Sequence, residues 1–280
     1  MKCVEKAYAK VNLTLAVGEK RPDGYHEVVS VMQRVSLCDT LTAERTASGI
    51  SLTCSDPTLP AGEENLAHRA AALFFRETGI AGGAALTLEK RIPSQAGLGG
   101  GSSDAASALL ALRKLYAPAL PDTELETMAA ALGSDVPFFI RGGTQLAAGR
   151  GEVLSPLPPL TDGWFVIVKP PEGFSTPAMY RRLDELPPQS PQSDGMTAAL
   201  GAGELRAVAA ALCNSFERVV PPDSAVWVIR EALRAQGALA AMLSGSGSAV
   251  FGLFDTETAA RAAVEALRPA WPEIFLARPV

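Results

Sequence analysis

A glycine-rich segment, PSQAGLGGGSSD at residues 93–104, constrains this chain more than any other part of its sequence. A strand is predicted before it, at 84–90, because Ala84, Leu86 and Leu88 fall at alternate positions. A helix is predicted after it, since apolar residues recur there at helical spacing. Glycines allow positive φ and close approach to a ligand, and the amides at a helix start carry partial positive charge. The order strand, glycines, helix therefore predicts a phosphate-binding site.

Other interpretations of a glycine-rich loop are a flexible turn or a tight contact between helix and sheet. Three consecutive glycines followed by Ser102, Ser103 and Asp104 favour phosphate binding here. The segment is not a Walker A loop, which needs G-K-[ST], nor a dinucleotide fingerprint, which needs G-x-G-x-x-G. The absence of H-R-D and D-F-G segments excludes a protein kinase. We expect Ser102 or Ser103 to cap the helix and Asp104 to lie in its first turn.

The first predicted element is a strand over residues 6–17, whose odd positions are apolar. Lys10 and Asn12 then share the face opposite the core, roughly 6 to 7 Å apart. The sequence RPDGYHE at 21–27 contains turn-forming residues and predicts a loop, and a β-rich stretch follows at 28–41.

Further elements are predicted from periodicity and capping signals. They are a helix at 64–78 ending at Gly79, a helix with a capping box from Thr123 to Glu126 that ends at Gly133, a buried strand at 164–169, a loop at 186–204, a helix stopped by Gly237, and a second glycine segment, LSGSGS at 243–248, before a short strand. Prolines at 156, 158 and 159 predict a domain boundary, giving domains 1–155 and 156–280.

Composition narrows the function classes. The 25 Lys and Arg residues against 30 Asp and Glu leave a net charge of -5, which argues against nucleic acid as the main partner. No apolar run approaches the roughly 18 residues that cross a bilayer, and the first residues do not resemble a signal peptide. The four cysteines and two histidines form no metal-ligand cluster. We therefore expect a cytoplasmic protein with reduced thiols, no zinc site and no membrane partner.

Several segments together resemble the GHMP family of small-molecule kinases. PSQAGLGGGSSDAA closely resembles that family's ATP phosphate loop, and AKVNL, SDVPFF and LSGSGSAVF resemble its other landmarks, in the same order. The resemblance implies an α+β fold in two domains, the first like domain 2 of ribosomal protein S5 and the second ferredoxin-like, with the active site in the cleft. Periodicity alone predicts only a mixed α and β protein.

Further segments are similar to one group within the family. These are RPDGYHE, GRGE at 149–152, VKPPEGFST at 168–176 and NSFE at 214–217. The resemblance implies an enzyme of the non-mevalonate isoprenoid precursor pathway that uses ATP and Mg²⁺. It would phosphorylate the 2-hydroxyl of a cytidine-diphosphate-linked methylerythritol. We expect this small molecule as the partner, and a monomer or weak homodimer.

The resemblance assigns the catalytic lysine to Lys10 and the catalytic aspartate to Asp135. By position alone, a lysine on the polar face of a strand is usually solvated, and an aspartate after a helix is usually a turn residue. The implied roles are that Lys10 stabilises charge while Asp135 orients the hydroxyl and accepts its proton late. Asn12, on the same face as Lys10, is expected to bind the substrate's polyol.

The substrate's cytidine end is assigned to Tyr25, His26 and Tyr180, by stacking and hydrogen bonding, although loop aromatic residues also commonly pack on a surface. Asn65 resembles a position near the adenine and could also be an N-cap. The resemblance places the following residues at the ATP: Pro93, Ala96, Gly97, Leu98, Gly99, Gly100, Gly101, Ser102, Ser103 and Asp104. Protein ligands of the Mg²⁺ stay unassigned, because magnesium often keeps its water and phosphate ligands.

Two other functions stay open. A different GHMP kinase could act on homoserine or mevalonate, but RPDGYHE and VKPPEGFST would then have no reason to match. A non-catalytic nucleotide sensor or interaction protein is disfavoured by the presence of both Lys10 and Asp135.

Overall fold

The computed structural model describes residues 1–187 and 193–280. The chain divides into two compact units that interleave along the sequence: Met1–Ala9, Cys38–Ser94 and Gly99–Gly142 form the first, and Lys10–Leu37, Gln95–Leu98 and Gly143–Val280 form the second. The long strands β1 (Lys2–Lys20) and β2 (His26–Thr46) contribute residues to both. The predicted α+β class is confirmed, and the predicted boundary after residue 155 stays a prediction.

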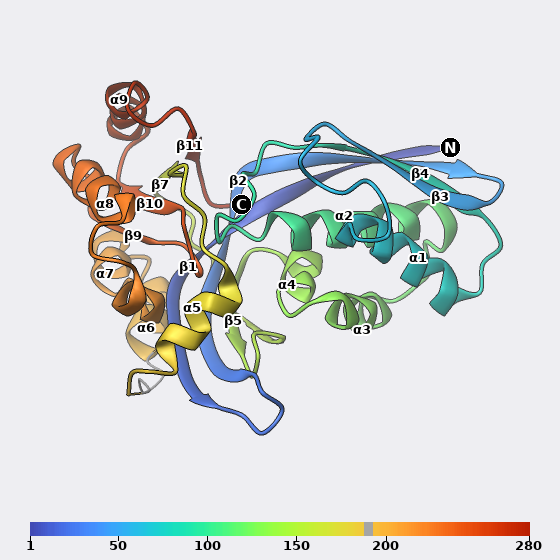
Figure 1. The fold of residues 1–280 in the computed structure, drawn as a ribbon, viewed down its shortest axis with the longest axis horizontal. Coiled ribbons are helices and arrows are strands. Elements are labelled where there is room, and N and C mark those ends of the chain that lie inside the picture. The colour runs from blue at the N-terminus through green and yellow to red at the C-terminus, as the bar shows by residue number, and fades with distance from the viewer. Residues whose placement is uncertain (188–192) are drawn as a thin grey trace. The chain divides into compact units, whose positions relative to one another are not determined.

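In the first unit, strands lie on one side and four helices on the other (Figure 1). β3 (Gly49–Cys54) pairs in parallel with β4 (Gly83–Glu89), which pairs antiparallel with β2. The alternation predicted for 84–90 is confirmed, because Ala84, Leu86 and Leu88 are buried. The helices are α1 (Leu66–Thr78), α2 (Gly100–Tyr116), α3 (Asp122–Leu132) and α4 (Val136–Arg141).

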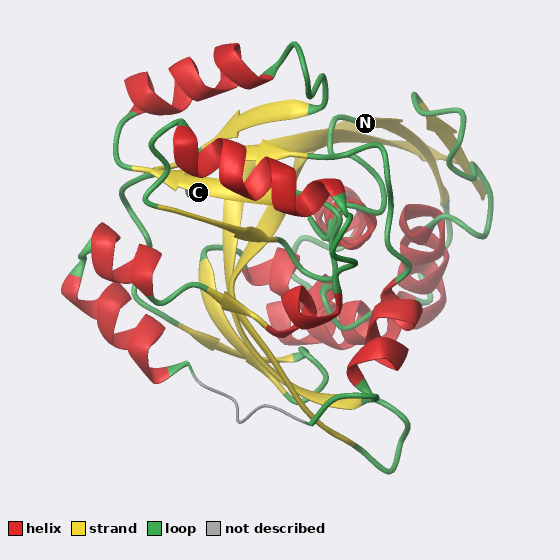
Figure 2. Ribbon diagram, turned by 60° about the vertical axis from the view of Figure 1, so that its left-hand side comes forward, coloured by secondary structure: helices red, strands yellow, loops and turns green. Residues whose placement is uncertain are grey.

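The second unit contains a four-stranded antiparallel sheet with the order β11-β7-β10-β9. α8 (Ala225–Ala235) and α9 (Glu257–Leu267) pack on it (Figure 2). Its strands are β7 (Trp164–Val168), β9 (Ala240–Leu243), β10 (Val250–Phe254) and β11 (Ile274–Ala277). The remaining elements of this unit are β5 (Thr144–Ala148), β6 (Val153–Pro156), α5 (Thr176–Leu183), α6 (Asp194–Ala202), α7 (Leu205–Ala210), β8 (Cys213–Asn214) and a 3₁₀ helix, η1 (Ser215–Val219).

Strand β1 confirms the predicted periodicity but not the exposure of its second face. The odd residues from Ala7 to Val17 are buried as expected, yet Lys10, Asn12 and Thr14 are buried too. Their polar groups hydrogen-bond with one another and with neighbouring strand β2, which offsets the cost of burying them. The polar residues in this part of β1 therefore face the protein interior and not the solvent.

Two predictions about local structure are wrong. The region predicted as a loop at 186–204 contains α6, where Met196, Ala199 and Leu200 are buried at helical spacing; residues 188–192 lie outside the described residues. The predicted capping box is absent, because α3 follows Pro121 and already includes Thr123. Pro121 presets the backbone before the helix, and Glu126 pairs with Arg141 at 2.7 Å instead. Helix ends at Gly79 and Gly133 are confirmed.

Candidate functional site

The first half of the glycine segment, Gln95–Leu98, belongs to the second unit, and other backbone groups of that unit pack tightly against it. Gly97 has a φ of +72°, and a Cβ there would collide with the carbonyl oxygen of Ser244. The carbonyl of Leu98 accepts a hydrogen bond of 3.0 Å from the backbone N–H of Lys10. Glycine is required at position 97 by its positive φ and by the closeness of the Ser244 carbonyl oxygen. These contacts are not those of a flexible turn.

The second half of the segment, residues 99–104, begins helix α2 in the first unit. Gly99 has a φ of +72°, and its carbonyl accepts the N–H of Ser103 at 2.9 Å. The amides of Gly100, Gly101 and Ser102 precede the first helical hydrogen bond and have no acceptor within the helix. Because these donors and the helix dipole act at one helix end, this end can bind an anion such as a phosphate. Pro93 lies half-buried in the preceding loop, and Ala96 is buried.

The predicted cap of α2 is wrong. Gly99 is the N-cap residue and caps without a side chain, so Ser102 and Ser103 lie within the helix. Asp104 consequently falls beyond the first turn. The reason is that Gly99 adopts the left-handed conformation and turns the chain into the helix earlier than the serines predict.

Asp104 belongs to a buried group of three charged side chains in the first unit. Lys90, at the end of β4, forms ion pairs with Asp39 of β2 and, at 2.7 Å, with Asp104. Asp39 also accepts the backbone N–H of Ile92 at 2.8 Å. A Cβ on Gly100 would lie 3.5 Å from Lys90 Nζ, so this group directly supports the first turn of α2.

Burial dominates the titration of this group. It raises the pKa of Asp104 to about 7, against the opposing effect of Lys90. Burial by itself would lower the pKa of Lys90, but the carboxylates of Asp104 and Asp39 outweigh it and raise that pKa. One carboxylate oxygen, Asp104 Oδ1, is buried and receives no hydrogen bond from the described part of the chain. Two carboxylates therefore share one ammonium, and the carboxyl of Asp104 keeps its proton to a higher pH than an ordinary aspartate does.

Lys10 and Asn12 are brought together on β1, as their spacing predicts. Lys10 Nζ donates to Asn12 Oδ1 at 2.5 Å, and Asn12 Nδ2 donates to Ser30 Oγ at 2.8 Å. Ser30 Oγ in turn donates to the carbonyl of Thr14 at 2.6 Å. This chain fixes which way the amide of Asn12 points, so its oxygen faces the ammonium. A preorganised, buried cation of this kind can stabilise negative charge on a bound phosphate.

Asp135 lies in the first unit, at the start of the short helix α4. It is the N-cap residue of α4 but does not cap the helix with its side chain, and it is half-buried. The sequence did not predict α4, because its six residues are too few to show helical periodicity. The catalytic roles given to Lys10 and Asp135 stay predictions.

His26 and Tyr180 lie side by side in the second unit. Their rings stack with centroids 4.8 Å apart and an angle of 21° between the planes. His26 Nε2 is 2.5 Å from Asp184 Oδ1, while Asp184 Oδ2 accepts from Lys20 at 3.0 Å. The hydrogen bonds from Lys20 and then His26 lower the pKa of Asp184, which keeps this carboxylate ionised. His26 is therefore held by a carboxylate on one ring nitrogen and by an aromatic ring on one face.

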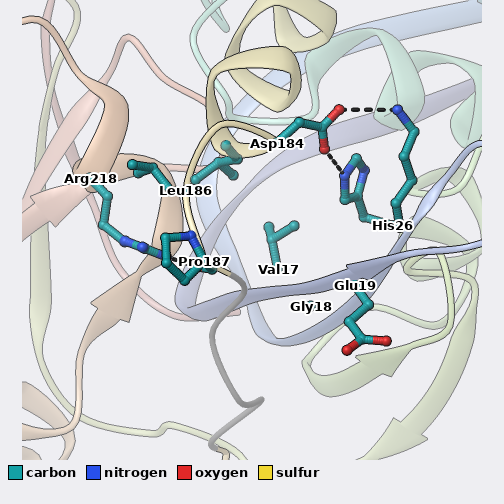
Figure 3. Close-up of a pocket in the computed structure, with 10 residues that line it drawn as sticks. Val17, Gly18, Glu19, His26, Asp184, Leu186, Pro187 and Arg218 are labelled. Carbon is teal, nitrogen blue, oxygen red and sulfur yellow. Dashed lines mark hydrogen bonds and ion pairs between the residues drawn. The ribbon is translucent and has the colours of Figure 1, made fainter.

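A pocket of about 180 Å³ adjoins this pair. His26 and Asp184 lie on one side of it, and Arg218 and Pro187 lie on the other, with Val17 between them (Figure 3). The pocket is smaller than those that enclose a whole drug-sized ligand, which usually exceed about 300 Å³. It could hold part of a ligand, with a cation and a carboxylate at its rim.

Tyr25 directly precedes His26, and its side chain is half exposed. The guanidinium of Arg150 lies over its ring, 4.9 Å from the centroid. The carboxylate of Glu152 accepts hydrogen bonds from the backbone N–H of Arg150 at 2.7 Å and from the Nε of Arg150 at 3.3 Å. The GRGE segment thus orders Tyr25 by a cation–π contact, which is a role the sequence did not reveal.

Asn65 is confirmed as a helix cap. Its Oδ1 accepts the N–H of Ala67 at 2.9 Å, and its Nδ2 donates to the carbonyl of Pro60 at 2.9 Å. These bonds fix the start of α1. A place near the adenine is compatible with capping and stays a prediction.

The sequence also contained signals for two residues that it did not single out. Asp184 follows Tyr180 by four positions, which puts both on one side of α5 and its end. Lys90 is a charged residue at the end of a strand directly before the glycine segment. Their partners, His26 and Asp39, are far away in the sequence, so only the fold brings these pairs together.

The described residues contain neither a candidate metal-binding cluster nor a candidate membrane-spanning helix. Among residues 1–187 and 193–280, no three His, Cys, Asp or Glu side chains are grouped so that they could hold a metal ion. In the same part of the chain, no helix combines the length and apolar character needed to span a membrane.

Comparison with known proteins identifies the family. The model of the GHMP kinases N-terminal domain matches residues 65–143, and that of the GHMP kinases C-terminal domain matches residues 196–273. The 4-diphosphocytidyl-2-C-methyl-D-erythritol kinase of Symbiobacterium thermophilum is 44% identical over 98% of both chains. The chain belongs to this family of GHMP kinases. The kinase of that name from Moorella thermoacetica is also 44% identical, over 97% of both chains.

A solved structure of the family agrees with the fold. The crystal structure of a 4-(cytidine 5'-diphospho)-2C-methyl-D-erythritol kinase matches 98% of both chains, with a TM-score of 0.83 and 40% identity. The chain is thus a small-molecule kinase, and ATP is the co-substrate of its family.

Proposed function

We propose that this chain transfers the γ-phosphoryl group of ATP to the 2-hydroxyl of 4-diphosphocytidyl-2-C-methyl-D-erythritol. The observation that carries the proposal is the 44% identity, over 98% of both chains, to a kinase named for this substrate. The product would be the 2-phosphate of the substrate, a precursor in the non-mevalonate isoprenoid pathway.

The start of α2 is the proposed site for the nucleotide's phosphates. The amides of Gly100, Gly101 and Ser102 have no helical acceptor, and Gly99 lets the chain enter the helix without a side chain in the way. Lys10 would stabilise negative charge on the transferred group, and its hydrogen bond to Asn12 fixes the position of its ammonium. Asn12 would also contact the substrate's polyol.

Asp135 is the proposed proton acceptor. In the transfer, the bond between the γ-phosphorus and the bridging oxygen of ADP breaks, and a bond from the substrate's 2-oxygen forms. The hydroxyl proton passes to the Asp135 carboxylate. Because the transition state is loose, this proton needs to leave only late, so Asp135 acts first by orienting the hydroxyl.

The donor atoms near the start of α2 fit a magnesium ion held mostly by the nucleotide. Ser102 and Ser103 provide hydroxyl oxygens, and Asp104 Oδ1 is a carboxylate oxygen with no hydrogen bond from the described residues. Magnesium prefers oxygen ligands and commonly keeps several waters. When bound, the ion would neutralise charge on the ATP phosphates.

His26 and Tyr180, with Tyr25, are the proposed site for the cytosine ring. His26 is buried and fixed by Asp184 at 2.5 Å, so it can present one defined hydrogen-bonding edge. Tyr180 stacks on His26, and Tyr25 is held by Arg150 with half of its surface exposed. Aromatic rings that are already ordered bind a base with little loss of conformational entropy.

The direct test uses purified protein with ATP, Mg²⁺ and the cytidylated methylerythritol. We expect formation of ADP together with a new phosphomonoester, which phosphorus NMR would place on the 2-oxygen. Homoserine and mevalonate are the control substrates, and neither should be phosphorylated at a comparable rate. Nucleotide binding without turnover of any of these alcohols would refute the proposed function.

A further inference from the structure

The side chain of Asn214 makes three hydrogen bonds, two of which join β8 to the second glycine segment. Its Nδ2 donates to the carbonyl of Leu243 at 2.9 Å and to that of Gly245 at 2.8 Å. Its Oδ1 accepts the backbone N–H of Phe216 at 2.9 Å. The side chain is buried, so both amide protons and the amide oxygen are used inside the protein.

The glycine segment that Asn214 binds lies directly against the first glycine segment. A Cβ on Gly245 would lie 2.9 Å from the carbonyl oxygen of Gly97 and 3.3 Å from Lys10 Nζ. Ser244 Oγ donates to the same Gly97 carbonyl at 3.1 Å. Gly245 has a φ of +55°, so its backbone is in the left-handed region where glycine is favoured. A shift of this loop would therefore move Gly97 and open the space beside Lys10.

Two further residues of the NSFE segment hold the same region. Ser215 Oγ accepts the backbone N–H of Val17 on β1, the strand of Lys10, at 3.0 Å. Glu217 Oε1 accepts the N–H of Leu243 at 3.1 Å, while its other oxygen is 3.2 Å from Arg230. The segment thus connects the lysine's strand with the loop that covers the lysine.

We propose that Asn214 is a positioning residue for phosphoryl transfer. By holding the carbonyls of Leu243 and Gly245, it keeps the loop at 244–248 against Gly97 and beside the ammonium of Lys10. The inference rests on the proposed function, because Lys10 and Gly97 are the groups placed at the phosphates. Asn214 itself touches none of the reacting atoms in this role.

The test compares Asn214→Ala and Asn214→Asp with a matched control, Thr256→Ala. Asparagine to alanine removes all three bonds, while aspartate keeps the acceptor for Phe216 but points a carboxylate oxygen at two carbonyl oxygens. Thr256 lies outside both glycine segments and caps α9 in the same unit by accepting the N–H of Ala259 at 3.2 Å. The control therefore reports the effect of a lost cap on the stability of this unit.

In both Asn214 variants, kcat should fall about 100-fold, which is the scale of an error of about 1 Å in positioning. The KM for the cytidylated substrate should stay within about twofold of wild type, since His26 is held by Asp184 and by stacking on Tyr180. Thr256→Ala should keep wild-type kcat. If either Asn214 variant folds and keeps kcat within about threefold of the control, the proposal is wrong.

Amide hydrogen exchange gives a readout that needs no activity. The N–H groups of Ser248 and Ala249 donate to the carbonyls of Gln95 and Ala96, both at 3.2 Å. Peptides covering 244–250 should exchange faster in the Asn214 variants and unchanged in Thr256→Ala. Unchanged exchange in folded Asn214→Asp would overturn the proposal even if the wild type phosphorylates none of the test alcohols. If the wild type is inactive but the Asn214 variants still exchange faster, the inactivity refutes only the proposed function, and the role of Asn214 in holding the loop stands.

Discussion

Replacing Asp104 with Asn should flatten the pH dependence of stability. Asp104 is buried beside Lys90, and burial raises its pKa to about 7. A carboxyl whose folded-state pKa is above its unfolded value contributes stability that is complete at pH below the unfolded value. That contribution is lost as the pH rises toward the folded value. The wild type should therefore lose stability from this group between pH 5 and pH 8.

The size of the effect follows from the two pKa values. A rise from 3.8 to about 7 is roughly three units, and each unit corresponds to about 1.4 kcal/mol. Part of this stability is already lost at pH 5, because the unfolded state is deprotonated there. The further loss between pH 5 and pH 8 is therefore about 3 kcal/mol. Asparagine cannot titrate, and Lys90 keeps Asp39 as its ion-pair partner in the variant.

The assay is urea unfolding of wild type and Asp104→Asn at pH 5, 6, 7 and 8. Circular dichroism is the suitable signal, because all three tryptophans lie in the second unit and Asp104 lies in the first. Asp122→Asn is the control, since Asp122 is an exposed carboxylate of the first unit. If wild type and Asp104→Asn change in parallel within about 0.5 kcal/mol from pH 5 to pH 8, the reasoning about the buried pair is refuted.

Substitutions at three residues test the proposed site. Asp135→Asn should lower kcat by at least about 100-fold and leave ATP binding intact by calorimetry; near-normal turnover would exclude the proton-acceptor role. Gly97→Ala should raise the KM for ATP at least about tenfold, because its φ is +72° and the new Cβ meets Ser244; unchanged nucleotide binding would contradict this. Tyr180→Ala should raise the KM for the cytidylated substrate about tenfold, and Tyr180→Phe should not; equal effects would argue against stacking beside His26.

Local signals in the sequence were sufficient where neighbours along the chain decide the structure. Alternation placed the odd residues of β1 and Ala84, Leu86 and Leu88 of β4 in the core, and Asn65 and Gly79 marked the ends of α1. The sequence also predicted the succession of a strand, a glycine segment and a helix, because all three parts lie within about thirty residues. Periodicity and capping depend on contacts three or four residues apart, which a sequence displays directly.

Resemblance to a family extended this to candidate residues, but not to their surroundings. Lys10 and Asn12 were expected on one face of a strand, and they do form a hydrogen bond. The burial of that face was not foreseen, because Ser30 on the next strand provides the partner that makes a buried amide tolerable. The start of α2 was misplaced for a local reason, since the conformation of Gly99 competed with two serines as the cap.

The sequence by itself determined the fold class, the glycine segments and the residue types available for phosphoryl transfer. Tertiary structure alone decided that Lys90 sits between Asp39 and Asp104, that Asp184 holds His26, and that Asn214 binds the second glycine segment. His26 and Asp184 are 158 positions apart, and Asn214 and Gly245 are 31 apart. Such pairs leave no periodic trace along the chain, because they form only when separate elements pack and a buried polar group must find a partner.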